Sequence, residues 1–163
     1  MIVLGLDPGL AATGYGVVSR LGREIRCLDF GCIKTSAREE TATRLKQIYD
    51  GVSDVIQRWS PQLVVLEEVF IKGAAPSAAL SIGQVRGVLL LAASQHGCKV
   101  NGLAPRSAKL AVTGSGTADK SQLERSLRRS LRLSQQIKPE HAADALGIAY
   151  VGAMRSRDGG RLR

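Results

Sequence analysis

The spacing of the apolar residues changes near residue 40, and this change constrains the fold more than any other feature of the sequence. Before it, three segments have the composition of β-strands and are joined by short turns: residues 1–7, 13–20 and 23–35. Such an arrangement predicts an antiparallel meander. After it, apolar residues recur every three or four positions from Leu45 to Trp59, which predicts a long amphipathic helix.

Strand-like and helical segments alternate in the middle of the chain. Residues 62–68 and 98–104 are short and mostly apolar, and we expect both to be strands. Between them, the spacing predicts a helix around Ser77–His96 that is apolar on much of its circumference. A helix that is apolar on more than one face is either deeply buried or shared with a second subunit.

The last third of the sequence is predicted to be helical. Ser121 and Glu124 have the spacing of a capping box, and a closing helix is expected from after Pro139 to about Met154. The whole order predicts one α/β domain over residues 1–152, with a mixed sheet covered by helices rather than a doubly wound parallel sheet. Residues 153–163 carry several arginines and two glycines and are predicted to form a disordered basic tail.

The charge of the chain points to a polyanionic partner. There are 23 Lys and Arg against 14 Asp and Glu, which gives a net charge of +9 and a pI of about 10. Nucleic acid is the commonest such partner, although solubility alone also explains a basic chain. Only 4% of residues are aromatic, which disfavours a membrane-surface helix, and no run approaches the ~20 apolar residues of a membrane span. Three cysteines without metal-ligand spacing favour reduced thiols in the cytoplasm.

Carboxylates follow two of the predicted strands. Asp7 ends the first strand before the turn residues Pro8 and Gly9, where α/β sheets place ligands and where turn-forming aspartates are also common. Glu67 and Glu68 end a nearly all-apolar strand. Neighbouring strand residues face opposite sides of a sheet, so at most one of these glutamates can share a site with Asp7.

A histidine and an aspartate share one face of the closing helix. His141 and Asp144 are three residues apart, a spacing also common on solvated helix faces, and the small Ala142, Ala143 and Ala145 between and beside them allow close approach to a sheet. Three carboxylates and one imidazole suit Mg²⁺ or Mn²⁺ better than zinc. Two such ions can cleave a phosphodiester, so the pattern predicts a nuclease site.

Three further residues are candidates for DNA contact. Phe70 is the one aromatic residue in a predicted loop and could stack on bases, or it could fold back into the core. Lys109 and Lys120 flank a predicted glycine-bearing loop, residues 111–120, that could lie against phosphates. Surface lysines without such a role are more common.

The sequence resembles the RuvC family of Holliday-junction resolvases. Five blocks occur in the family's order: GLDPGLAATGYGVV, LEEVF, SAALSIGQVRG, GSGTADKSQ and HAADALGIA. The resemblance implies a ribonuclease-H-like fold with a mixed five-stranded sheet and helices on both faces. It further implies a homodimer that binds four-way junction DNA and nicks two strands symmetrically, leaving 5′-phosphates. Mg²⁺, replaceable by Mn²⁺ and bound as two ions, and the branch-migration proteins RuvA and RuvB are also implied.

The resemblance assigns roles to particular residues. The family's catalytic and metal-binding residues match Asp7, Glu67, His141 and Asp144. Its crossover aromatic and its two lysines match Phe70, Lys109 and Lys120, and its dimer helix matches the helix around Ser77–His96.

The chain departs from the family pattern at two positions. His141 stands where the better-known pattern has Asp, which leaves it either as a metal ligand or as a neutral group that positions the attacking water. Ala74 stands where an Asn is common. An actin-like ATPase or sugar kinase would need a second domain, and a junction-binding module without catalysis would not need all four site residues.

Overall fold

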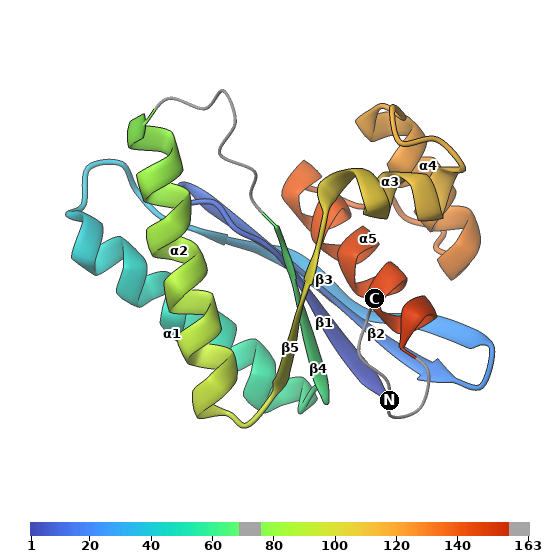
Figure 1. Ribbon diagram of the computed structural model, residues 1–163, viewed down its shortest axis with the longest axis horizontal. Coiled ribbons are helices and arrows are strands. Elements are labelled where there is room, and N and C mark those ends of the chain that lie inside the picture. The colour runs from blue at the N-terminus through green and yellow to red at the C-terminus, as the bar shows by residue number, and fades with distance from the viewer. Residues whose placement is uncertain (69–75, 157–163) are drawn as a thin grey trace.

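A mixed sheet of five strands forms the centre of the protein. The computed structural model describes residues 1–68 and 76–156, and the strand order in its sheet is β3-β2-β1-β4-β5 (Figure 1). The first three strands pair antiparallel, and β4 and β5 run parallel to β1. The predicted mixed sheet is confirmed. The strands are β1 (Ile2–Asp7), β2 (Ala12–Leu21), β3 (Glu24–Lys34), β4 (Leu63–Glu67) and β5 (Lys99–Leu103).

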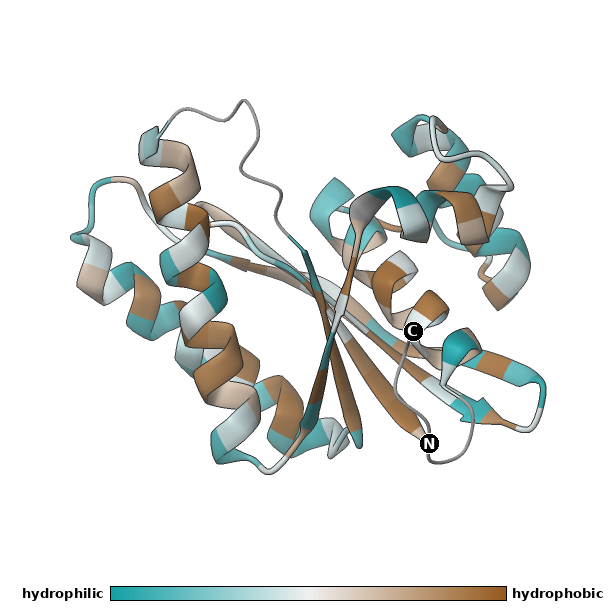
Figure 2. Cartoon of the chain, in the orientation of Figure 1, coloured by the Kyte–Doolittle hydropathy of each residue, from teal (hydrophilic) through white to brown (hydrophobic). Residues whose placement is uncertain are grey.

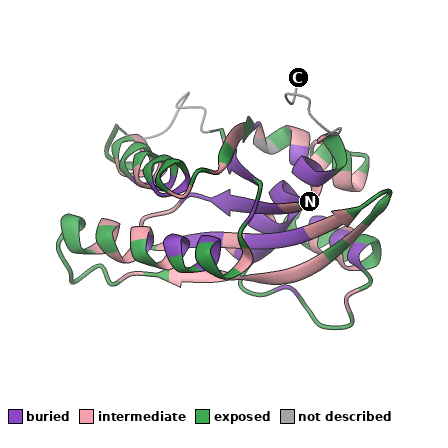
Figure 3. Ribbon diagram, turned by 90° about the horizontal axis from the view of Figure 1, so that it is seen from below, coloured by how far each residue is buried: buried purple, intermediate pink, exposed green. Residues whose placement is uncertain are grey.

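Helices cover both faces of the sheet, as predicted (Figure 1). Because side chains alternate along a strand, β1 contributes Val3 to one core and Leu4 and Leu6 to the other. The Leu4 side packs against α1 and α2, and the Val3 side against α3, α4 and α5. Buried positions accordingly lie in the strands and on the inner helix faces (Figure 3). The helices are α1 (Thr41–Trp59), α2 (Pro76–Gln95), α3 (Pro105–Thr113), α4 (Lys120–Leu131) and α5 (Glu140–Arg155).

Helix α5 lies unusually close to the sheet because glycines face it. A Cβ added at Gly5 would lie 2.2 Å from the carbonyl oxygen of Ala145, and one added at Gly16 would lie 2.4 Å from Cα of Leu146. A Cβ at Gly14 would lie 2.0 Å from the carbonyl oxygen of His141. The absence of side chains at these positions lets the backbone of α5 rest directly on β1 and β2.

The structure corrects three details of the sequence analysis. Residues 111–113 belong to α3 rather than to the predicted loop before Lys120. The capping box of α4 is formed by Asp119 and Gln122, not by Ser121 and Glu124. Helix α5 continues to Arg155 and Ala153 is fully buried, so the first residues of the predicted tail belong to the domain.

Helix α2 is apolar on its outer side as well as its inner side (Figure 2). By length and composition it is the one helix, among the described residues, that could cross a membrane. No run of this kind was expected from the sequence. Only 22% of its most apolar window is buried. One such helix is weak support for a membrane span, since interface helices of water-soluble proteins share these properties.

Candidate active site

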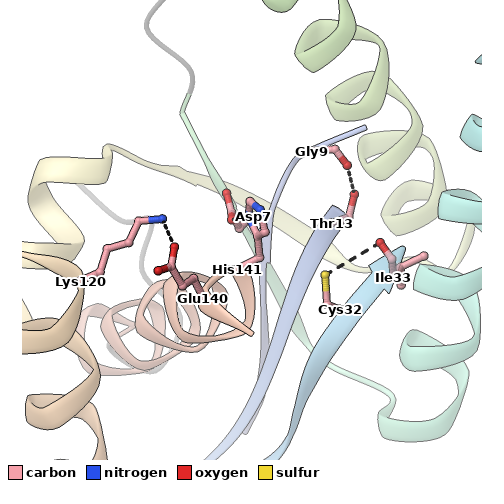
Figure 4. Close-up of polar contacts among 8 residues, drawn as sticks. All are labelled: Asp7, Gly9, Thr13, Cys32, Ile33, Lys120, Glu140 and His141. Carbon is pink, nitrogen blue, oxygen red and sulfur yellow. Dashed lines mark hydrogen bonds and ion pairs between the residues drawn. The ribbon is translucent and has the colours of Figure 1, made fainter. Parts of the chain in front are cut away.

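Two carboxylates meet at the carboxyl ends of neighbouring strands. β1 and β4 are parallel, with Leu6 opposite Leu66, so Asp7 and Glu67 follow at the same sheet edge. Asp7 is buried at 8% exposure, and the loop after it is fixed by Thr13, whose hydroxyl donates to the Gly9 carbonyl at 2.8 Å (Figure 4). Glu68 is exposed, and its side chain lies against Gly102 of β5. The structure therefore brings Glu67, and not Glu68, next to Asp7.

Helix α5 adds the other two predicted residues to this edge. The His141 ring contacts Asp7, with 2.7 Å between Nδ1 and the Asp7 Oδ2 (Figure 4). Asp144, one turn later, is partly buried on the same side of the helix. The contact of α5 with Gly14 and Gly16 sets the height of both side chains above the sheet.

The carboxylates repel one another. Burial, followed by the negative charges of Asp7 and Asp144 and a hydrogen bond with Asp7, raises the pKa of Glu67 from 4.5 to about 7. Burial and then the charge of Asp7 also raise the pKa of Asp144. Lys109 lowers the pKa of both groups, and Lys120 lowers that of Asp144. Both lysines therefore lie near the carboxylate cluster formed by Asp7, Glu67 and Asp144. Such an arrangement favours a bound cation.

The two predicted lysines approach the cluster from different helices. Lys109 lies within α3, and Lys120 is the first residue of α4. The Lys120 Nζ lies 2.6 Å from Oε2 of Glu140, at the start of α5 (Figure 4). Phe70 and Ala74 lie outside the described residues.

Comparison with known proteins decides the family. The family model for the crossover junction endodeoxyribonuclease RuvC matches residues 3–151. The chain belongs to the RuvC family. This confirms the family and the endonuclease class predicted from the sequence.

Full-length relatives of the RuvC family support the assignment. RuvC of Desulforamulus reducens is 38% identical, with 100% of both chains covered. RuvC of Photobacterium profundum is 45% identical over 93% of this chain and 86% of its own. The structure of Thermus thermophilus RuvC in complex with a Holliday junction substrate matches with a TM-score of 0.87 and 32% identity, covering 98% of this chain and 97% of that one. The close match also confirms the ribonuclease-H-like fold.

The RuvC site has the donors that Mg²⁺ prefers, in an open arrangement. Among the described residues, no three Asp, Glu, His or Cys side chains stand close enough to enclose one ion as they are placed. Mg²⁺ does not require such a cage, since it keeps several waters and binds through one or two carboxylates plus substrate phosphate oxygens. An oxygen-rich set of carboxylates that repel one another is compatible with an ion bound in this way.

Sequence reasoning missed one residue that contacts the site. The guanidinium of Arg86, on α2, donates to the backbone carbonyl of Glu67. It thereby joins the apolar helix to the end of β4. Arg86 is the one charged residue between Pro76 and Gln95, and that isolation within an apolar helix was the available signal.

Proposed function

We propose that this protein is a cytoplasmic endonuclease that resolves four-way (Holliday) DNA junctions during recombination and repair. It would hydrolyse two phosphodiester bonds symmetrically and leave 5′-phosphate nicks. The observation that carries the proposal is the 2.7 Å contact between His141 and Asp7, because it joins the helix-borne half of the site to the strand-borne half. The T. thermophilus relative, solved with a Holliday junction substrate, supports the choice of DNA.

Each site residue has a proposed role in that reaction. Asp7, Glu67 and Asp144 hold Mg²⁺, which Mn²⁺ can replace. A pair of such ions, when bound, would lower the pKa of the attacking water and stabilise the leaving oxygen. His141 uses Nδ1 to contact Asp7, which leaves Nε2 available to accept a proton from that water. Lys109 and Lys120 neutralise phosphates, and Phe70 contacts bases at the crossover.

His141 should act as a proton acceptor in the cleavage step. We expect His141→Ala to lower the single-turnover cleavage rate roughly a hundredfold, within the range for loss of a general base. We expect His141→Asp to keep at least a tenth of wild-type activity, because a carboxylate also accepts a proton. An alanine variant that cleaves at the wild-type rate would remove His141 from the mechanism.

The exposed face of α2 is the proposed dimer interface. Leu80 is 65% exposed and Leu91 53% exposed, and both lie opposite the sheet-facing Val85 and Leu89. Gly83 and Gly87 lie on the same outer face, and a Cβ on either would meet nothing within 4 Å. The face is therefore smooth and apolar, as close helix–helix packing between two copies requires. Partnership with RuvA and RuvB is part of the same proposal.

Leu91→Arg should separate the dimer, because it places a charge in an apolar interface. We expect the dimer dissociation constant to rise at least a hundredfold, as measured by light scattering coupled to gel filtration over a dilution series. Leu110→Arg is the matched control, since Leu110 is 54% exposed on α3, away from the proposed interface. Equal loss of dimer in both variants, or in neither, would contradict the assignment.

The metal-free protein should become less stable as the pH rises, because of Glu67. Its folded-state pKa, about 7, lies above its ordinary value of 4.5, so the folded protein retains a proton that the unfolded chain releases. Stability is then lost as pH rises from about 5 to about 7. In EDTA at pH 8, Glu67→Gln should raise the melting temperature by roughly 3–6 °C, after allowance for the half-buried carboxyl. The same variant should lose most of the stabilisation that Mg²⁺ gives the wild type. A lower melting temperature for this variant in EDTA would contradict the electrostatic account.

Substrate choice is tested by comparing a synthetic four-way junction with a linear duplex of matched sequence. We expect Mg²⁺-dependent nicks in two strands of like polarity of the junction, sealable by DNA ligase. The linear duplex should stay intact, and EDTA should stop the reaction. Equal cleavage of the two substrates, or cleavage in EDTA, would contradict the proposal.

A further inference from the structure

A row of arginines lies along the outer face of α4, outside the site described above. Leu123, Leu127 and Leu131 bury the inner face of this helix. Arg125 and Arg129 are exposed and, four residues apart, share the opposite face. The exposed Arg132, which follows the last residue of α4, lines a hollow together with them. We call these three residues the arginine ridge.

Within the described part of the chain, the ridge arginines form no ion pair. The neighbouring Arg128 pairs with Glu124. Glu24 and Asp119 lie near Arg132 and Arg125 without forming an ion pair with them. Three arginines held close together repel one another, so a surface of this kind favours an anionic partner.

Two hollows flank the ridge and continue its polar surface. One runs between α3 and α4 and is lined by Thr113, Ser115 and Gln122 together with Arg125 and Arg129. The other lies at the far end of α4, near the β2–β3 turn, and is lined by Arg132, Arg23, Arg26 and Glu24, of which Arg26 and Glu24 form an ion pair. Hydroxyl, amide and guanidinium donors thus line both sides of the helix, and such donors bind phosphate oxygens.

The start of α4 lies beside the candidate active site, and the ridge lies further along the helix, on its other face. Lys120, at the first turn of α4, pairs with Glu140 next to His141, and the arginines follow along the same helix. A helix of 12 residues is about 18 Å long, which equals about five base pairs of duplex at 3.4 Å each. A row of positive charges of this length favours the repeated phosphates of duplex DNA over an acidic protein.

We propose that the arginine ridge binds the sugar–phosphate backbone of a junction arm beyond the point of cleavage. This inference rests on the proposed function, since the arm belongs to the junction held at the active site. Its contribution is affinity without base recognition, because the ridge offers charge to phosphates and no aromatic surface to bases. The chemical step is left to the residues at the sheet edge.

The test is junction binding as a function of salt, measured in EDTA so that the DNA stays intact. For Arg125→Gln/Arg129→Gln we expect the slope of log affinity against log salt to become shallower by about 1.8, at about 0.9 for each lost phosphate contact. Affinity at low salt should fall ten- to a hundredfold. Arg125→Lys/Arg129→Lys should keep most of the slope because it keeps the charge.

Arg38→Gln/Lys46→Gln is the matched control, since it removes two exposed charges before and within α1. We expect its salt slope to stay within about 0.5 of the wild-type slope, which corresponds to roughly half a phosphate contact. An unchanged slope in the ridge variant, as an acidic protein partner would predict, or an equal change in the control, would overturn the inference. Failure of the wild type to cleave junctions would instead overturn the proposed function.

Discussion

Asp7→Asn is expected to reduce the rate of junction cleavage at least a thousandfold while leaving junction binding within about threefold of wild type. Asp7 is the point at which the two halves of the site meet, because its carboxylate contacts His141 and lies beside Glu67. The amide removes the negative charge that would hold Mg²⁺ and the acceptor that orients the imidazole. A thousandfold loss corresponds to about 4 kcal/mol of transition-state stabilisation. Single-turnover cleavage and binding in EDTA measure the two effects separately.

Glu68→Gln is the control for this prediction. Glu68 is also an acid at the end of a strand, yet its side chain is exposed and lies against Gly102. We expect its cleavage rate to stay within about threefold of wild type. An Asp7→Asn variant that loses less than tenfold in rate would contradict the proposed role of Asp7.

Gly16→Ala is expected to lower the free energy of unfolding by about 3 kcal/mol or more, because the added methyl group would overlap the backbone of Leu146. The helix could accept it only by moving away from β2, which would also displace His141 and Asp144. We expect the melting temperature to fall by roughly 6–12 °C and cleavage to fall with it. Thermal unfolding and single-turnover cleavage at a temperature where the variant is folded measure both effects.

Gly147→Ala provides a control in the same layer of the structure. Gly147 lies within α5, and an added Cβ would make an ordinary contact, 3.5 Å from Cδ1 of Leu127. We expect a change of no more than about 1 kcal/mol, and a stabilising one, because alanine favours helix over glycine. A Gly16→Ala variant as stable as Gly147→Ala would show that close packing of α5 on the sheet is unimportant.

Features that depend on local pattern were predictable from the sequence. The alternation of strands and helices followed from the period of the apolar residues. Asp7, His141 and Asp144 were recognisable because strand ends and one helix face restrict where their side chains point. The choice between Glu67 and Glu68 needed the family resemblance, since alternation shows only that the two face opposite ways.

The exact ends of helices and the contacts between distant segments were not predictable from spacing. The predicted loop began at residue 111 because glycines and small polar residues follow closely in the sequence and are typical of a turn. In the structure those residues come after the end of α3, and residues 111–113 are helical. Asp119 caps α4 because its carboxylate accepts a hydrogen bond from the backbone N–H of Gln122. From spacing alone, the pair Ser121 and Glu124 was an equally plausible capping box. Arg86 contacts the Glu67 carbonyl only once α2 has packed beside β4.

The most direct test of the central claim is the position of bound metal in crystals of the full-length protein grown with Mn²⁺. The claim is that side chains from β1, β4 and α5 form one metal site. We predict anomalous difference density in contact with carboxylate oxygens of Asp7, Glu67 and Asp144. The density should disappear in Asp7→Asn crystals grown in the same way. Mn²⁺ bound only elsewhere, at a concentration that supports junction cleavage in solution, would contradict the account.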